Sequence, residues 1–412
     1  MAGVRSTLRI PEFRALLISY VINRAGDVFG ALALAIVVLG ATKSAIAIAA
    51  LFLATQFFPG LVGPFVVARI GAIPAGRILP ACYVVEACLF LVLAAVSRHV
   101  GVTLIVGLAF VDGTLAFAAR SVTRATTAST LIPHDLMPEG KAAFNVALGL
   151  ATVAGPVLGG VVLAQLGPAT ALAVDGLSFL VAAALIACTP GLRARHRAEE
   201  TRATRSRQLR ASIRYIAGHA TLRVLIFGEG IAFVFFYLVV PVTVVYATRS
   251  LHAGPAGYAA ILASWGTGAI IGSTVHIRLA RRIGHATILL STAAVAVAYL
   301  GTALAPTLLV ACAASVLGGV GNGTQWASVE TAVHQLVEEH LRLRVSAVLE
   351  SMAAIAPGAG IILGGALAAL FSPRAAYLAA GLGLVAVITA AALSRALAAA
   401  PGRVATADLG SA

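Results

Sequence analysis

Ionisable side chains are rare inside the long apolar segments of this chain, and they are the best candidates for chemistry. Four that lie inside such segments are Arg24, Asp27, Asp112 and Glu229. A charge at the middle of a bilayer costs about 2.5–3.5 kcal/mol even on mild scales, so each one needs a partner or a function. Arg24 precedes Asp27 by three residues, on nearly the same face of a helix, so the two charges can partly neutralise each other.

An acid beside a removable positive charge can bind a proton or a cation and release it when its surroundings change. This is the minimum chemistry of proton-coupled transport, and Asp27 beside Arg24 is the candidate. The alternative is a static ion pair that packs one helix against its neighbour. Asp112 is a candidate second protonation or substrate site, or a buried acid bonded to a neighbouring hydroxyl. Asp175 and Glu350 lie near the ends of apolar segments, where we expect them to cap or anchor a helix.

Other kinds of chemistry find little support in the sequence. There is no Walker loop, no HExxH and no GxSxG motif. The four cysteines lie inside apolar segments without a CxxC pair. The glycines of Gly319-x-Gly321-x-Gly323 lie inside an apolar segment, where close helix packing explains them. We therefore expect no catalytic site, no metal and no cofactor.

The candidate residues must be positioned by helices that cross a membrane. The chain of 412 residues is 60% hydrophobic and 11% charged, whereas a soluble domain carries about 25% charged residues. Twelve apolar segments are each long enough to cross a bilayer: 15–39, 45–68, 78–97, 102–120, 142–166, 170–189, 223–247, 256–277, 286–304, 308–328, 345–370 and 375–399. We therefore predict an all-α membrane protein with twelve transmembrane helices.

The basic residues are distributed unevenly between the two sides of this predicted membrane protein. With a cytoplasmic N-terminus, 24 of the 29 Lys and Arg residues fall on the inside and four on the outside. This is the asymmetry of the positive-inside rule, so both termini are expected to be cytoplasmic. The net charge of +14 then reflects topology rather than nucleic-acid binding. The preference for Arg over Lys and the abundant alanine indicate a GC-rich bacterial genome, and hence the bacterial inner membrane.

The two halves of the chain repeat each other. A set of glycines, prolines and leucines recurs 205 positions later: Gly155, Gly159, Gly160, Pro168, Gly176 and Leu177 reappear as Gly360, Gly364, Gly365, Pro373, Gly381 and Leu382. The same offset relates Arg24 to Glu229, which carry opposite charges. Repeated halves in membrane-type sequence are typical of transporters with a substrate path between the halves.

The repeat also predicts the organisation of the chain. We expect an N-terminal six-helix bundle over 1–190, a cytoplasmic Arg-rich linker over 191–222, a C-terminal six-helix bundle over 223–400 and a cytoplasmic tail over 401–412. The linker is either a solvated connector or a binding segment for anionic lipid headgroups.

Three motifs carry a family resemblance: Ala118-Ala119-Arg120 followed by Leu131-Ile132-Pro133, then Gly155-Pro156-Val157-Leu158-Gly159-Gly160, then Asp175-Gly176-Leu177-Ser178-Phe179. With Gly26-Asp27, they resemble the drug:proton antiporters of the major facilitator superfamily, closest to the twelve-helix branch with macrolide and siderophore exporters. The segment with Gly155, Pro156, Gly159 and Gly160 resembles the family's antiporter motif, which is associated with export. Generic helix packing is the alternative reading of its small residues.

The loop between the second and third segments keeps part of another family motif. Gly63, Arg69, Gly71 and Arg77 match its frame, but Ala68 stands where the family has an acid. In the family this loop forms a charge latch that helps to set the conformational equilibrium. Ala68 removes the acidic partner of that latch.

The resemblance also places the first and seventh helices opposite each other across a central cavity. It therefore predicts a bridge between Arg24 and Glu229 that forms in one state and breaks in the other. Glu86 lies in a helix that the superfamily places peripherally, so we expect it to take no part. A cavity wall is mostly apolar with a few polar groups. The candidates for it are Tyr20, Asn23, Gln56, Phe233, Tyr237, Asn322, Gln325 and Trp326.

These observations predict a secondary active transporter that works by alternating access. We expect it to export a small amphipathic compound, such as a drug, antibiotic or siderophore, in exchange for protons, and to function as a monomer. Its expected partners are the small-molecule substrate, protons and the lipid bilayer, and no nucleic acid. A metabolite importer of the same fold and a transport-inactive receptor or scaffold are the alternatives. An intramembrane enzyme lacks any catalytic constellation.

Overall fold

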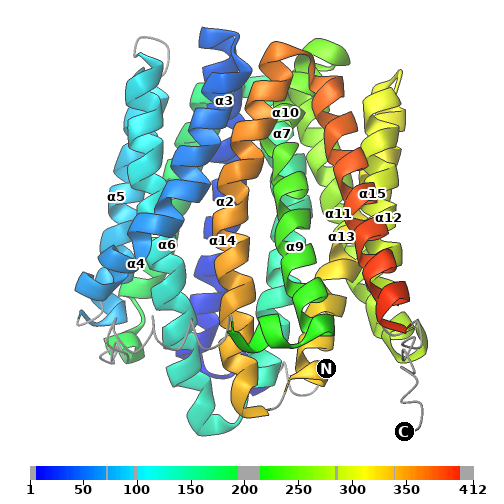
Figure 1. The fold of residues 1–412 in the computed structure, drawn as a ribbon. Helices are drawn as coiled ribbons and strands as arrows, with labels where there is room; N and C mark the ends of the chain where they lie inside the picture. Colours follow the sequence, from blue (N-terminus) through cyan, green and yellow to red (C-terminus); the bar gives the residue numbers. More distant parts are fainter. Residues whose placement is uncertain are drawn as a thin grey trace, which may run out of the picture.

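The computed structural model describes residues 6–70, 73–96, 101–193, 214–283, 286–337 and 339–399, and most of them are helical (Figure 1). The first elements are α2 (Pro11–Thr42), α3 (Ala45–Phe52), η1 (Leu53–Phe57), α4 (Phe58–Ile70), α5 (Ala75–Val96), α6 (Val102–Leu131), η2 (Ile132–His134), α7 (Met137–Ala187) and η3 (Pro190–Arg193). The later elements are α9 (Ala220–Leu238), α10 (Val240–Val245), η4 (Tyr246–Ser250), α11 (Gly254–Ile283), α12 (Ala286–Leu304), α13 (Leu308–Leu336), α14 (Glu339–Leu370) and α15 (Pro373–Ala399).

Many of these helices have the length and composition of membrane spans. Within the described residues, ten helical segments are long and apolar enough to cross a bilayer. Hydroxyl side chains inside the helices bond to carbonyls of the preceding turn, as Thr126 does to Val122 at 2.8 Å and Ser315 to Ala311 at 2.8 Å. Such local bonds satisfy polar groups where no water is available. The ten candidate spans confirm that the described part of the chain is built from helices of membrane-spanning type, as predicted.

The 51 residues of α7 form two helices that join at Gly167. A continuous helix of this length would extend roughly 76 Å, more than twice the thickness of the hydrocarbon core. Gly167 has φ 82° and ψ 174°, a backbone conformation that glycine adopts readily. Pro168 follows and suits the first turn of the next helix. The break lies between the predicted segments 142–166 and 170–189.

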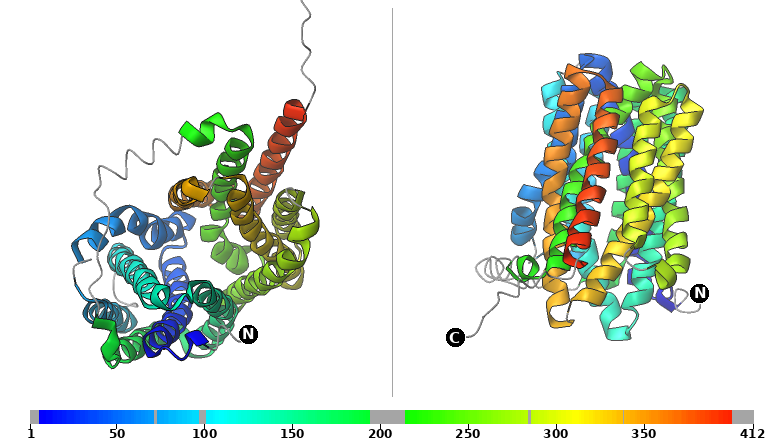
Figure 2. Two further views of the ribbon diagram at one scale, coloured as in Figure 1. Left: turned by 90° about the horizontal axis from the view of Figure 1, so that it is seen from below. Right: turned by 45° about the vertical axis from the view of Figure 1, so that its right-hand side comes forward.

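The helices fall into two sets by their contacts. Helices α2–α7, here the N-terminal helices, pack mostly on one another, and so do α9–α15, the C-terminal helices (Figures 1 and 2). The two sets meet mainly where α7 contacts α11 and where α14 contacts α3. Helix α2 begins and α15 ends at the same end of the molecule, which we call the lower end from its position in Figure 1. The opposite end is the upper end.

Repeat-related glycines lie at both junctions between the sets. A Cβ built on Gly160 of α7 would lie 2.3 Å from the Cβ of Ala259 on α11. A Cβ on its repeat counterpart Gly365 of α14 would lie 2.5 Å from the Cβ of Ala49 on α3. Small residues allow helices to approach this closely. The two copies of the repeat therefore make equivalent contacts across the junction, and both contacts lie toward the upper end.

A hydrogen bond also links the two sets at the upper end. Lys43 ends α2 in the left-handed conformation, with φ 54° and ψ 26°. The guanidinium of Arg249 in η4 donates to the Lys43 carbonyl. This bond and the glycine contacts hold the two sets together at the upper end.

Within the C-terminal helices, α11 and α13 approach each other through glycines from both sides. A Cβ on Gly268 of α11 would lie 2.1 Å from a backbone carbonyl oxygen of α13, and a Cβ on Gly319 of α13 would lie 2.1 Å from one of α11. One turn further along each helix, a Cβ on Gly272 or on Gly323 would lie 2.2 Å from a backbone carbonyl oxygen of the other helix. Close helix packing thus accounts for the glycines of α13, as the sequence predicted.

Candidate functional site

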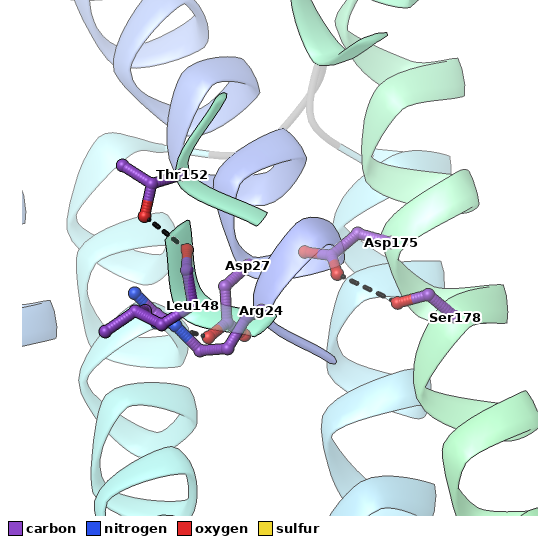
Figure 3. A network of polar contacts seen from close by, with 6 residues as sticks. All are labelled: Arg24, Asp27, Leu148, Thr152, Asp175 and Ser178. Carbon is purple, nitrogen blue, oxygen red and sulfur yellow. Dashed lines mark hydrogen bonds and ion pairs between the residues drawn. The ribbon is translucent and has the colours of Figure 1, made fainter. Parts of the chain in front are cut away.

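An ion pair lies near the middle of α2. Arg24 Nη1 is 2.8 Å from Asp27 Oδ2, and the two side chains are 31% and 18% exposed. Three residues separate the two side chains along the helix, so the helical geometry alone brings them together. Figure 3 shows the pair on one side of α2.

Glu229, the repeat counterpart of Arg24, has a different kind of partner. Its side chain is 5% exposed, and its Oε2 accepts a 2.9 Å hydrogen bond from Gln325 Nε2 of α13. In this structure Arg24 is paired with Asp27, so the predicted bridge between Arg24 and Glu229 is not present in this arrangement. The structure instead joins Glu229 to a residue that the sequence placed in the cavity wall.

Two predicted cavity residues lie beside this hydrogen bond. Phe233 is one turn along α9 from Glu229, and Trp326 follows Gln325 on α13. The rings of Phe233 and Trp326 lie 5.8 Å apart between centroids. Phe233 is 8% exposed, whereas Trp326 is 38% exposed. These four residues, Glu229, Phe233, Gln325 and Trp326, form a contiguous group that we call the α9–α13 cluster.

The predicted cavity residues of α2 lie on the turns next to the ion pair. Tyr20 packs its ring edge-to-face on Phe144 of α7, with centroids 5.0 Å apart. Asn23 is 5% exposed, and its amide nitrogen has no hydrogen-bond partner among the described residues. Phe144 is not among the predicted cavity residues, because an isolated aromatic residue in an apolar segment carries no distinguishing signal.

The remaining predicted residues are less closely connected. One carboxylate oxygen of Asp112 is buried without a partner in the described part of the chain. Tyr237 and Asn322 are half-buried. Gln56 is exposed on η1, and no hydrogen bond connects it to the other candidates.

The predicted loop motif lies at the lower end, between α4 and α5. Arg69 and Arg77 are both exposed. A Cβ on Gly63 would lie 2.2 Å from the ring of Phe117 on α6, so this glycine allows α4 and α6 to pack closely. Gly71 lies outside the described residues.

The predicted antiporter-type motif lies where α7 contacts two other helices. A Cβ on Gly155 would lie 3.0 Å from Val28 of α2, and one on Gly159 would lie 2.7 Å from Phe29. Pro156 is buried within α7, and Gly160 faces α11 as described above. The motif therefore has a packing role, whatever its role in transport.

Glu86 differs from expectation. The family resemblance predicts a peripheral helix for it, but its side chain is 0% exposed, and neither carboxylate oxygen has a partner among the described residues. A single acid in an otherwise apolar segment was the available signal, and the family analogy led us to discount it.

Asp175, which we expected to cap or anchor a helix, is also buried. It is 0% exposed and packs against the middle of α2, where a Cβ on Gly30 would lie 2.2 Å from its Oδ2. A Cβ on Gly26 would lie 2.5 Å from its Oδ1, to which Ser178 donates at 3.4 Å. Figure 3 shows Asp175 on the side of α2 away from the ion pair. The spacing of Gly26 and Gly30, four residues apart, was the signal for this close approach.

Two expectations concern parts of the chain that are not described. The side chain of Glu350 and residues 194–213 of the predicted linker lie outside the described part. Among the residues that are described, no group of three or more His, Cys, Asp or Glu side chains is placed to hold a metal ion.

Comparisons with known proteins identify the kind of molecule that carries these residues. The sequence profile of a major facilitator family described as "Transmembrane secretion effector" matches residues 2–403. No curated protein sequence matches the chain.

Solved structures of membrane transporters share the fold. The nucleoside transporter NupG, in a mutant form, superposes with a TM-score of 0.72 at 13% identity, covering 93% of this chain and 99% of that one. The peptide transporter POT in complex with alafosfalin has a TM-score of 0.70 at 12% identity and covers 94% of each chain. A bacterial homologue of the iron transporter ferroportin in the inward-facing state has a TM-score of 0.69 at 16% identity, covering 94% and 98%.

Proposed function

Because the chain belongs to the transmembrane secretion effector family of major facilitator transporters, we propose that it is a proton-coupled exporter of a small amphipathic compound such as a drug, antibiotic or siderophore. The multi-pass fold is that of membrane transporters, which implies a small-molecule substrate and a bilayer environment. The observation that carries the proposal is the Arg24–Asp27 ion pair near the middle of a membrane-spanning helix.

The proposed topology has twelve crossings with both termini in the cytoplasm of a bacterium. Ten candidate spans become twelve when α7 is counted as two helices and α11 is added. The two sets of helices then correspond to bundles over 1–190 and 223–400, with a linker over 191–222 and a tail over 401–412. The excess of basic residues in the predicted inside segments supports this orientation in the bacterial inner membrane.

The proposed coupling step takes place at Asp27. When its carboxylate is ionised, it holds the Arg24 guanidinium at 2.8 Å. A proton that binds to Asp27 removes this attraction and leaves the cation free to find another partner, so protonation changes the forces across the cavity. The next candidates to receive the proton lie in the same set of helices: Asp175 and Glu86 are buried, and Asp112 is half-buried with one buried carboxylate oxygen.

Alternating access requires the contacts at the upper end to open. The bond from Arg249 to Lys43 and the glycine contacts of Gly160 and Gly365 join the two sets there. We infer that the present arrangement is closed at the upper, outer end and that the substrate enters from the lower, inner end. The description of the family as a secretion effector and the antiporter-type motif of α7 both support export.

Two other functions of the same fold make different predictions. A metabolite importer would accumulate its substrate instead of removing it. A transport-inactive receptor or scaffold would bind a ligand without proton-dependent flux, and the missing acid at Ala68 is the observation that favours it. We propose a monomer as the functional unit in either case.

The test is the accumulation of drugs and dyes in bacteria that lack their own efflux pumps. Cells that express the protein are expected to accumulate less of at least one compound, and a protonophore is expected to abolish the difference. Asp27→Asn, at matched membrane levels, is expected to behave like the empty vector, because it cannot release a proton. Export that persists in Asp27→Asn would contradict the coupling role. An unchanged accumulation across a broad panel would contradict drug export.

The state of the transport cycle in which the upper end is open can be tested by exchanging charges between the two sets of helices. We expect Arg24 and Glu229 to meet when the two sets rotate, because they occupy repeat-related positions on α2 and α9. Arg24→Glu and Glu229→Arg are each expected to reduce transport at least tenfold, and the double exchange is expected to restore part of it. The readout is the initial rate of efflux. A double variant as inactive as either single variant would rule out the bridge.

A further inference from the structure

The α9–α13 cluster contains a carboxyl group without a cationic partner in the described protein. Glu229 is 5% exposed, and its one described hydrogen bond comes from the neutral amide of Gln325. The described residues form one ion pair, which joins Arg24 to Asp27. A carboxyl group in apolar surroundings needs a proton or a cation to balance its charge. Asp27 has a cationic partner in this arrangement, whereas Glu229 has none among the side chains that the structure describes.

Two aromatic residues belong to the same cluster as this carboxyl group. Phe233 is one turn away on α9, and its ring centroid is 5.8 Å from that of Trp326. The 38% exposure of Trp326 leaves part of the indole accessible to a ligand. A cation within about 6 Å of an indole face is attracted by the ring quadrupole, and tryptophan is the best of the aromatic residues for this contact. The rings also provide apolar surface for the body of the ligand.

The amide of Gln325 strengthens the negative character of the cluster. Its nitrogen donates to one oxygen of Glu229 and thereby orients the carboxylate. Its own oxygen is buried and accepts no hydrogen bond within the described part of the protein. A carboxylate and an amide oxygen without a described donor, in one cluster with two aromatic rings, disfavour an anion and favour a cation.

We propose that the α9–α13 cluster is a binding site for an apolar organic cation, with Glu229 as the counter-charge and Phe233 and Trp326 as the ring faces. Gln325 acts as the positioning residue for the carboxylate. The inference rests on the proposed function in one respect, namely that the bound cation is the exported cargo. The binding itself does not require transport.

The test uses the full-length protein in lipid nanodiscs and two probes of the same shape and opposite charge. Tetraphenylphosphonium is the cation and tetraphenylborate is the anion, and equilibrium dialysis measures their affinities. Glu229→Gln keeps the length of the side chain and removes its charge. We expect it to weaken tetraphenylphosphonium binding at least tenfold, which corresponds to about 1.4 kcal/mol, and to leave tetraphenylborate binding unchanged or stronger.

Further variants separate the contributions of charge and ring. Trp326→Leu is expected to weaken cation binding about tenfold, whereas Trp326→Phe, which keeps a ring, loses less. Glu12→Gln removes one negative charge at the lower end of α2 and is expected to leave the affinity unchanged. Equal affinities in wild type and Glu229→Gln, equal losses for both ions, or no binding of tetraphenylphosphonium by the wild type would each overturn the site.

A fluorescence measurement keeps the test valid if Glu229→Gln does not fold. The chain has two tryptophans, so Trp265→Phe leaves Trp326 as the sole indole emitter with Glu229 intact. Tetraphenylphosphonium is expected to change its emission with saturation, and tetraphenylborate is not. The same response to both ions would overturn the proposal. Binding that depends on Glu229 in a protein that exports nothing would uphold the site and reject the exporter. Proton-driven export by a protein whose cation binding does not depend on Glu229 would uphold the exporter and reject the site.

Discussion

Neutralising Arg24 and Asp27 together is expected to abolish coupled transport while leaving the protein folded. Asp27→Asn alone leaves Arg24 as an unpaired cation in the middle of α2, which costs about 2.5–3.5 kcal/mol on the mild scales. Arg24→Gln combined with Asp27→Asn removes both charges and leaves two neutral amides. We therefore expect the thermal stability of the double variant to exceed that of Asp27→Asn and to approach the wild type.

Transport is not expected to recover in the double variant as stability does. This comparison distinguishes a role of the pair in proton coupling from a role in helix packing. Both the single and the double variant lack the Asp27 carboxyl group, at which we place the coupling step, so proton-driven efflux should fall below a tenth of the wild-type rate in each. The measurements are initial efflux rates in proteoliposomes and melting temperatures of the same preparations. Arg14→Gln, which removes an exposed charge at the lower end of α2, is the control and should retain transport. A double variant that recovers transport together with stability would reduce the pair to a static packing contact.

A large loss of stability from a single added methyl group is expected at Gly319. A Cβ at this position would lie 2.1 Å from the carbonyl oxygen of Trp265. The obstructing atom belongs to the backbone of α11, so a change of rotamer cannot make room and the two helices must separate. Overpacking of this kind costs about 1–3 kcal/mol, and we expect Gly319→Ala to lower the melting temperature of the purified protein by several degrees.

The matched control is Gly228→Ala on α9, where nothing lies within 4 Å of the added Cβ. Alanine is the better helix former by about 1 kcal/mol, so this variant should be at least as stable as the wild type. Both substitutions add one methyl group to a C-terminal helix, and they differ in the space available. Equal melting temperatures for the two variants would show that α11 and α13 are not packed as closely as described.

The acids of the N-terminal helices show why burial is difficult to predict from the sequence. Glu86 and Asp175 stand out in the sequence as charges within or beside apolar segments. The family analogy placed the first at the periphery, and the position of the second in its segment indicated a cap. The structure buries both completely. The direction in which a side chain points depends on the rotation of its helix about its own axis. Helix α5 is apolar on most sides, because its lipid and protein neighbours are both apolar, so its sequence does not show this rotation.

The sequence by itself determined the properties that depend on local spacing and on composition. Apolar length predicted the spanning helices, the repeat predicted two related sets of helices, and three residues of separation brought Arg24 to Asp27. Only the tertiary structure decided the contacts between distant segments. Glu229 and Gln325 are 96 residues apart, and their hydrogen bond requires a particular rotation of both α9 and α13. In a membrane protein hydrophobicity does not distinguish the inward from the outward face, so these rotations follow from helix packing alone.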